Sequence, residues 1–571
     1  MKKLFILSAI ALAGASLTGC DDFLDDNRYP LSQQTVNPEF WSNPENVQAQ
    51  INYFYEDFLG YGNAGGSGAF YFTWTTDDQC GRTAFADWKN LSVPSSSSNW
   101  SGPYTEIRRA NLVIEGVNSG SITGAQANNF IGIARLYRAM QYFDLVKKYG
   151  DVPMVTQVLD PAETEILYGP RTSRNDVMDF VLEDLNFAID NISTVANKTT
   201  FSVDLARAIK AEICLYEGAY AKYHQKDNTR ASKYFNEVVS AAEPIASKYT
   251  ICGDYTSLYK SLRTAGGGYN GLSSNSEVIF MKAYEEGVFM HSTMDYSCAS
   301  DGIAGITRDA FDSFLFLDGK IAANTSLDPT DAGVLAADGK SISIQNLLDV
   351  RDQRLAMTTY PNLLYQGMTW AGPNTANMWS KTGYGVAKYD NWTFSNADAT
   401  TANRGWTCAP LYWGARLYLA ILEAKAELGT ITDADLTKYM KPLWDRAGFT
   451  VDPTLALLNS TNDPANDVNV SSLIWEIRRC RRCELMMDDD IRYWDLVRWH
   501  MLDHMDTTKY PKIIQGANVS MDPNASPKIG DYLDCSYGQS RIFNERQYLY
   551  PVPSGEIQLN PDVLKQNPGW E

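Results

Sequence analysis

The stretch IARLYRAMQYFDLVKKYGDVPMV, from Ile133 to Val155, has the pattern of a helix that ends in a sharp turn. Its apolar residues recur at intervals of three and four, which places them on one face of a helix. They are Leu136, Ala139, Met140, Phe143 and Val146. Gly150 is a typical C-terminal cap, and Pro153 cannot continue a helix. We therefore expect an amphipathic helix over residues 131–149.

The same pattern recurs along the chain. We expect helices over residues 173–192, 204–222, 229–248, 411–428 and 433–447, and a helical region over 471–500 that bends near Asp488–Asp490. Ser173 is a suitable N-cap for its helix. Small residues between large ones, as in LYLAILEAKAELG (417–429), suit close helix packing. Paired helices of this kind resemble tetratricopeptide-like hairpins, although the match to the 34-residue repeat is loose. The expected fold is mainly α.

Three long inserts interrupt these helices, at about 60–105, 250–305 and 320–410, and they are rich in Gly, Ser, Asn, Trp and Tyr. We interpret them as long loops with a few short strands. Loops of this length in a compact protein usually carry function. The chain thus divides into a helical scaffold, mainly at about 105–250 and 410–505, and a loop-built face.

Composition limits the partners. The 571 residues include 49 basic and 68 acidic side chains, which gives a formal charge of −19. Such a chain repels phosphate backbones, so nucleic acid is not an expected partner. Aromatic residues make up 12% of the chain, and Tyr and Trp offer a flat apolar face with a polar edge. That combination suits ligand platforms as well as a protein core.

The first nineteen residues have the pattern of a secretory signal, with two lysines before a short apolar segment. The segment ends in Leu17-Thr18-Gly19-Cys20, which resembles the lipobox of bacterial lipoproteins. The resemblance implies that Cys20 becomes an acylated N-terminus, and two or more acyl chains give stable membrane anchoring. The alternative is a secreted protein with a stray cysteine. Residues 20–35 would form an acidic tether, because Asp21, Asp22, Asp25 and Asp26 resemble the surface-export tag of lipoproteins in Bacteroides-like bacteria.

Three further stretches resemble the SusD/RagB family. Ile133–Val155 is similar to the family's first helix and its Tyr-Gly-Asp-x-Pro exit. RRCRRCELMMDDDIRYWDLVRW (Arg478–Trp499) is similar to its arginine-rich helical region, and YLYPVPSGEIQLNPDVLKQNPGW (Tyr548–Trp570) to its C-terminal signature. Two departures lie in the scaffold: Cys480 replaces a usual glutamate, and Asp488–Asp490 replaces a Glu-Gly pair. The resemblance implies that residues 36–571 form a single SusD-like domain, with its signature at 548–570.

The family resemblance implies a role without catalysis. Its members are outer-membrane lipoproteins on the cell surface that capture oligosaccharides. They lie over a SusC-like TonB-dependent transporter, with the tetratricopeptide-like helices facing it, and deliver the glycan uncleaved. A binder of peptide or another non-glycan nutrient remains an alternative, because some relatives handle such cargo. A glycan-degrading enzyme would need two carboxylates facing one bond, and no motif in the sequence singles out such a pair.

Residues for sugar binding can be selected by their chemistry. An aromatic ring covers the flat C–H patch of a pyranose, while short polar side chains bond its hydroxyls. The candidates are Trp74, Asp77, Asp78, Arg82 and Trp88 in the first insert, Tyr284, His291 and Tyr296 in the second, and Trp370, Trp379 and Trp392 in the third. Each tryptophan has the alternative of anchoring its own loop. The inserts show no basic patch, which favours a neutral glycan over an acidic one.

Tryptophans outside the inserts are expected to be structural: Trp100, Trp494, Trp499 and Trp570. Arg478, Arg479, Arg481 and Arg482 form a basic run. It could grip an anionic lipid or a transporter loop, but we favour ion pairs with Glu476, Glu484 and Asp488–Asp490 of the same helical region.

No cofactor is expected. Cys480 and Cys483 form a C-x-x-C without a second pair, and we expect them to pack on a helix. His500 and His504 have a spacing that could hold zinc, but no third ligand is apparent. Acidic loops such as Asp77–Asp78 could supply oxygen ligands to a structural calcium ion, although no motif marks such a site.

Overall fold

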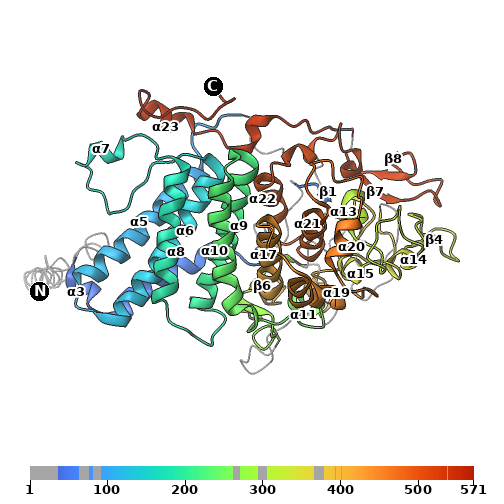
Figure 1. Ribbon diagram of the computed structural model, residues 1–571, viewed down its shortest axis with the longest axis horizontal. Helices are drawn as coiled ribbons and strands as arrows, with labels where there is room; N and C mark the ends of the chain where they lie inside the picture. The colour runs from blue at the N-terminus through green and yellow to red at the C-terminus, as the bar shows by residue number, and fades with distance from the viewer. Residues whose placement is uncertain are drawn as a thin grey trace, which may run out of the picture.

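The long helices of the computed structural model stand in a row (Figure 1). The structure describes residues 37–62, 76–80, 92–260, 271–293, 305–365, 379–391, 394–399, 401–536 and 538–571. The row consists of α5 (Ser98–Ser119), α6 (Gly124–Tyr149), α8 (Arg174–Asn191), α9 (Val203–Tyr220), α10 (Asn228–Ala246), α17 (Gly414–Glu427) and α21 (Ser472–Glu484). Each helix packs on the next one in this order. The fold is mainly α, as the helical patterns predict.

Shorter helices flank the row. They are α3 (Pro38–Trp41), α4 (Pro44–Asn52), α7 (Thr164–Leu167), α11 (Thr256–Tyr259), α13 (Arg308–Ser313), α14 (Gln345–Leu348), α15 (Gln353–Thr358), α16 (Asn396–Ala399), α18 (Asp433–Asp435), α19 (Lys441–Arg446), α20 (Leu455–Ser460), α22 (Ile491–Arg498) and α23 (Ser554–Leu559). Turns of 3₁₀ or π geometry are η1 (Tyr53–Asp57), η3 (Ala221–Gln225), η4 (Leu436–Met440), η5 (Leu502–Met505), η6 (Pro511–Ile514) and η7 (Glu545–Tyr548). Among the described residues, no helix has the length and apolarity that a membrane span needs.

The strands are short and pair in small antiparallel sheets. They are β1 (Gln79–Cys80), β2 (Val278–Lys282), β3 (Gly305–Ile306), β4 (Val334–Leu335), β5 (Ile342–Ser343), β6 (Ala409–Trp413), β7 (Gln515–Asn518), β8 (Lys528–Ile529) and β9 (Tyr532–Asp534). β1 pairs with β3, β2 with β6 and β4 with β5, while β9 lies between β7 and β8. Most of these strands lie in the inserts or near the C-terminus.

Helix boundaries follow local chemistry. The hydroxyl of Ser173 accepts a hydrogen bond from the N–H of Asp176 at 3.2 Å, which confirms the expected cap of α8. The helix expected over 411–428 is wrong at its start, because Ala409–Trp413 is strand β6, paired with β2. The chain turns into α17 at Gly414, whose N–H donates to the carbonyl of Glu277 at 2.7 Å. A Cβ atom at Gly414 would lie 2.3 Å from the carbonyl oxygen of Tyr249.

The expected bend near Asp488–Asp490 is a complete break between α21 and α22. Met487 and Asp489 adopt left-handed backbone angles, with φ of 67° and 51°. The carboxylate of Asp488 accepts hydrogen bonds from the hydroxyls of Tyr259 at 2.8 Å and Tyr389 at 3.0 Å, and it pairs with Lys388 at 2.8 Å. Residues of the second and third inserts therefore hold the break in place.

Most of the buried apolar side chains of the described residues, from Trp41 to Leu564, form one continuous cluster. Cys80 and Cys535 form a small separate one. Trp100, Trp494, Trp499 and Trp570 are buried, as expected. Cys480 and Cys483 are buried on α21 as packing residues.

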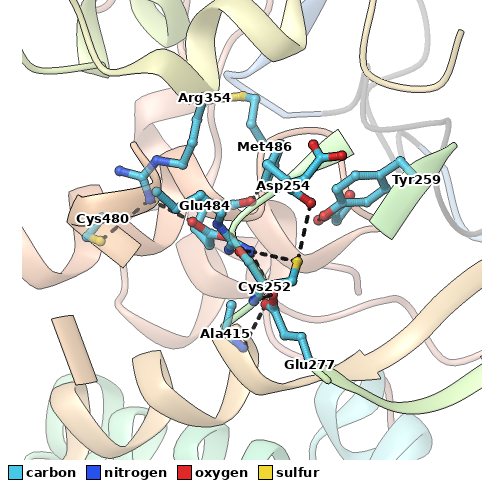
Figure 2. Close-up of polar contacts among 12 residues, drawn as sticks. Cys252, Asp254, Tyr259, Glu277, Arg354, Ala415, Cys480, Glu484 and Met486 are labelled. Carbon is cyan, nitrogen blue, oxygen red and sulfur yellow. Dashed lines mark hydrogen bonds and ion pairs between the residues drawn. The ribbon is translucent and has the colours of Figure 1, made fainter. Parts of the chain in front are cut away.

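A buried ionic network links the scaffold to the inserts (Figure 2). Arg446 on α19 donates to Glu277 at 2.6 Å and also pairs with Glu484 on α21. Glu484 in turn accepts from Arg354 on α15 at 2.8 Å, and Arg354 contacts Asp352. All five side chains are buried. Removing one partner would leave an unmatched charge in the interior, which is costly.

The arginine run of α21 also faces inward. Arg478 pairs with Glu427, Arg479 with Glu476 and Asp463, Arg481 with Asp495, and Arg482 with Asp78 and Asp309. The expected ion pairing is confirmed, but most of the partners are different from those expected. Among these contacts, Glu476 is the one partner that was expected from the sequence. The remaining partners lie outside α21.

Candidate ligand-binding surface

Seven of the residues predicted to act in lipidation or ligand binding lie outside the described part of the chain. They are Cys20, Trp74, Arg82, Trp88, Tyr296, Trp370 and Trp392. Five lie within it: Asp77, Asp78, Tyr284, His291 and Trp379. Of these five, Trp379 is partly exposed, and the other four are buried.

The side chains of Asp77 and Asp78 are buried and pair with arginines inside the protein. Arg492 donates from Nε and Nη2 to Asp77 at 2.9 and 2.6 Å, and Arg482 donates from Nε to Asp78 at 2.6 Å. Although burial opposes ionisation, the charges of Arg482 and Arg492 lower the pKa of Asp77 well below its usual range. Both carboxylates are 1% exposed and matched by arginines. Their positions do not support the prediction that they contact a ligand, and the arginines occupy the place that a calcium ion would need.

The buried side chains of Tyr284 and His291 anchor the loop to which they belong, residues 284–291. The hydroxyl of Tyr284 accepts from the N–H of Tyr61 at 2.9 Å and donates to the carbonyl of Leu59 at 3.3 Å. His291 Nδ1 accepts from the N–H of Thr293, and its Nε2 lies 3.1 Å from the carbonyl of Thr407. Burial lowers the pKa of His291 to about 3, so its ring is neutral near pH 7. Neither side chain faces solvent, which removes them from the ligand-contacting set.

The loop that they anchor presents a different ring to solvent, that of Phe289. Its centroid lies 4.9 Å from that of Tyr284 with an interplanar angle of 6°, and Tyr284 also stacks on Tyr61 at 6.3 Å and 19°. We call Tyr61, Tyr284 and Phe289 the aromatic stack. Phe289 is 48% exposed, whereas the other two rings are buried. The stack therefore holds one face of Phe289 rigidly against the protein.

The surroundings of Phe289 combine apolar and charged groups. Val288 is 76% exposed and Leu59 is 52% exposed. The ammonium group of Lys282 lies 5.5 Å from the Phe289 centroid and donates to the carbonyl of Phe58 at 2.7 Å. An antiparallel bridge between Glu285 and Phe289 closes the loop. A flat exposed ring with a hydrogen-bond donor nearby suits the binding of a sugar.

Sequence reasoning selected this loop but missed Phe289. The available signal was the pair Val288-Phe289, two large apolar residues directly after a glycine in a polar turn. Large apolar side chains in such a place are either a loop anchor or a binding surface. Tyr284 and His291, which were predicted to bind sugar, anchor the loop instead.

A second loop lies beside the first. Gly405 and His291 exchange backbone hydrogen bonds of 2.9 and 2.8 Å. The N–H of Asn403 donates to the hydroxyl of Ser292 at 2.9 Å. Trp406, which follows Gly405, is partly buried, and its ring lies 4.1 Å from that of Phe394. Residues 284–291 and 403–407 thus form the described part of a candidate surface.

A cavity of about 730 Å³ lies between α5, α6, α9 and α22, and its lining includes Phe58 and Leu59. Its walls include the ion pairs of Arg416 with Glu212 and of Arg498 with Asp495. Burial and the adjacent Asp490 carboxylate raise the pKa of Asp489, another wall residue, to about 7. None of the residues predicted from the sequence to bind ligand lines this cavity. We therefore place the candidate surface at the loops.

The two histidines whose spacing could hold zinc, His500 and His504, do not share a helix. α22 ends at Arg498, before His500, and His504 lies on the turn η5. Their rings stack on different partners, His500 on Tyr548 and His504 on Tyr510. The described residues contain no cluster of three or more His, Cys, Asp or Glu side chains that could hold a metal ion.

Comparison with known proteins gives the family. A family model described as the SusD family matches residues 264–570, and one described as "Starch-binding associating with outer membrane" matches residues 23–215. Since the first model covers more than half of the sequence, this chain belongs to the SusD family.

Individual relatives are similar over part or all of the chain. A SusD-like protein (P38) of Formosa agariphila is 33% identical over 133 residues, which are 23% of this chain and 26% of the relative. A SusD-like protein of Bacteroides ovatus is 32% identical over 122 residues, which are 21% of this chain and 22% of the relative. These matches span about a quarter of each curated relative.

A crystal structure of a SusD-like carbohydrate-binding protein from Bacteroides fragilis superposes with a TM-score of 0.66 at 20% identity. The match covers 92% of this chain and all of that one. A second SusD-like structure from the same species gives a TM-score of 0.66 at 22% identity, over 95% and 100% of the two chains. At these identities the likeness establishes the shared fold.

Proposed function

We propose that this protein is a cell-surface lipoprotein that binds oligosaccharide or polysaccharide and delivers it uncleaved to a SusC-like TonB-dependent transporter in the outer membrane. The observation that carries the binding step is the exposed face of Phe289, supported by the aromatic stack. A ring held in this way loses little conformational entropy when a sugar covers it. Family membership and the carbohydrate-binding description of the B. fragilis relative support the same ligand class.

The ligand surface includes Phe289 and Trp379 among the described residues, together with Trp74, Arg82, Trp88, Tyr296, Trp370 and Trp392. Val288, the neighbour of Phe289 in the chain, adds a further exposed apolar side chain to the same loop. Lys282 adds one cation, but the net charge of −19 leaves a neutral glycan favoured over an acidic one.

Binding is tested by calorimetry of the purified protein against glycans selected on an array that also includes peptides. Phe289→Ala is expected to weaken glycan binding about five- to thirtyfold, since stacking on one ring contributes about 1–2 kcal/mol. Leu559→Ala is the matched control, because this side chain is 71% exposed on α23. Equal affinities of the two variants would reject Phe289 as a platform, and binding of peptides alone would reject the glycan.

Anchoring and delivery have separate tests. Cys20→Ala is expected to abolish labelling with radioactive palmitate and to release the protein from the outer membrane. Affinity purification of the tagged lipoprotein from membranes is expected to retain a TonB-dependent transporter. The appearance of new reducing ends on labelled oligosaccharide would contradict uncleaved delivery.

A further inference from the structure

Two cysteine side chains that lie far apart in the sequence meet in the interior. The thiol of Cys80, on β1, donates to the carbonyl of Cys535 at 3.0 Å. The two side chains form a small apolar cluster against Ile514. They are 1% and 0% exposed. Side chains in direct contact meet the first requirement for a disulfide bond.

The surroundings hold both sulfur atoms in place. β1 pairs with β3, through Cys80 and Gly305. The N–H of Cys535 donates to the carbonyl of Ile514 at 2.8 Å, and its thiol lies 3.6 Å from the carbonyl of Lys381. Contacts with Gly305, Ile514 and Lys381 therefore hold the two segments that carry the sulfurs.

We propose that Cys80 and Cys535 form a disulfide bond in the exported protein. The inference rests on the proposed cell-surface location, because disulfides form and persist in oxidising compartments. None of the other described cysteine pairs offers the same contact. Cys480, for example, faces Arg354, whereas Cys483 faces Ser313.

The chemistry requires a thiol oxidase that carries its own disulfide. The thiolate of one cysteine attacks that disulfide and forms a mixed disulfide, releasing one oxidase thiol. The thiolate of the second cysteine then attacks the mixed disulfide at the sulfur of the first and releases the other oxidase thiol. Two S–H bonds are lost and one S–S bond forms in this chain, while the oxidase takes up two electrons and two protons. Because both sulfurs are buried in the folded chain, the exchange takes place before β1 packs.

The bond would join the first insert, through Cys80, to the C-terminal part of the chain, through Cys535. Cys80 lies between Trp74 on one side and Arg82 and Trp88 on the other, all of them predicted ligand residues. A crosslink at this point limits the unfolded conformations of the chain. It would also hold Cys80 in place, between the stretch that carries Trp74 and the stretch that carries Arg82 and Trp88.

The test is a thiol count on the full-length protein purified from outer membranes. The denatured chain is labelled with N-ethylmaleimide before and after reduction, then digested and analysed by mass spectrometry. We expect two fewer labelled cysteines before reduction and a linked peptide that contains Cys80 and Cys535. Cys535→Ser is expected to make Cys80 reactive, whereas Cys214→Ser, a buried cysteine on α9, leaves the link intact.

A second measurement separates this proposal from the proposed function. Wild-type protein refolded in a glutathione redox buffer is expected to form the same link, whatever its cellular location. Its melting temperature is expected to fall by about 5 °C in reductant, with no such change for the double variant Cys80→Ser/Cys535→Ser. Complete labelling before reduction, or a link from Cys80 to another cysteine such as Cys298, would overturn the proposal while leaving glycan binding to be judged by its own assay.

Discussion

Arg492 and Asp77 are 415 positions apart in the sequence and form a two-point ion pair, with nitrogen–oxygen distances of 2.9 and 2.6 Å. Arg492 belongs to α22, whereas Asp77 precedes β1 in the first insert. Both side chains are buried. The pair fastens a segment of the first insert to α22, which packs on α9 of the helical row.

Asp77→Asn is expected to lower the free energy of unfolding by about 3–5 kcal/mol, because Arg492 and Arg482 would lose a buried counter-charge. Urea unfolding at pH 7 followed by circular dichroism measures the change. Asp562→Asn, at an exposed aspartate near the C-terminus, is the control and should change stability by less than about 0.5 kcal/mol. A loss of the same small size in both variants would mean that the ion pair contributes no net stability.

The difference in unfolding free energy between wild type and Asp77→Asn should also depend on pH. The pKa of Asp77 is lowered in the folded protein, so its stabilising contribution is present above the unfolded pKa of about 4 and is lost as the pH falls further. The stability gap between wild type and Asp77→Asn should therefore be largest near neutral pH and narrow below about pH 4. A gap that widens on acidification would contradict the assigned charge state.

Asp489 is expected to behave in the opposite way. Its folded pKa is raised to about 7, so its ionisation destabilises the folded protein as the pH rises from about 4 through 7. Asp489→Asn should match wild type near pH 4 and exceed its stability by on the order of 4 kcal/mol at pH 8, since each tenfold change in an acid dissociation constant corresponds to about 1.4 kcal/mol. Asparagine also tolerates the left-handed backbone at this position, where φ is 51°. Urea midpoints across this pH range, with the exposed Asp531→Asn as control, would reveal a constant difference if the assignment were wrong.

Two glycines provide a matched test of the aromatic stack. Gly60 and Gly287 both have positive φ, 64° and 72°, so alanine at either site costs about 1 kcal/mol through backbone strain. At Gly60 a Cβ atom would also lie 2.6 Å from the Tyr284 hydroxyl, whereas nothing lies within 4 Å at Gly287. Gly60→Ala should therefore lower the melting temperature more than Gly287→Ala. Equal shifts would show that the stack adapts without cost.

Trp74→Ala addresses the part of the ligand surface that lies outside the described residues. We expect a lower glycan affinity with a nearly unchanged melting temperature, because the proposed role of this ring is to cover a sugar. Calorimetry and thermal unfolding of the same preparation give both quantities. An unchanged binding isotherm would show that Trp74 only packs its own loop.

The sequence was most informative where structure depends on local periodicity. The apolar spacing after Ile133 predicts α6 through to Tyr149, and Ser173 predicts the start of α8. The segment Leu411–Trp413 was mispredicted because its apolar pattern fits a helix as well as a strand. Its conformation depends on pairing with β2, more than a hundred residues earlier. Long-range pairing of this kind leaves no local signal.

The candidate site was predicted at the level of loops rather than side chains. The sequence selected the second insert, but Tyr284 turned inward and Phe289 outward. Burial of Asp77 and Asp78 could not be anticipated, because it depends on Arg482 and Arg492 arriving from the far end of the chain. For Asp77 and Asp78, the contacts that decide their burial join segments separated by hundreds of residues. For Tyr284 and Phe289, the directions of the side chains depend on the shape of an irregular loop.

The ionic network in Figure 2 has a consequence for the order of assembly. A polypeptide is made from its N-terminus, so Glu277 exists before its partner Arg446, and Arg446 before Glu484. Helices α5 to α10 pack on one another in chain order, so these contacts can form before α17 and α21 have been made. The insert that carries Glu277 must wait, with its carboxylate still hydrated, until the last quarter of the chain has emerged. A truncated or stalled chain would thus have a formed helical half and no completed loop face.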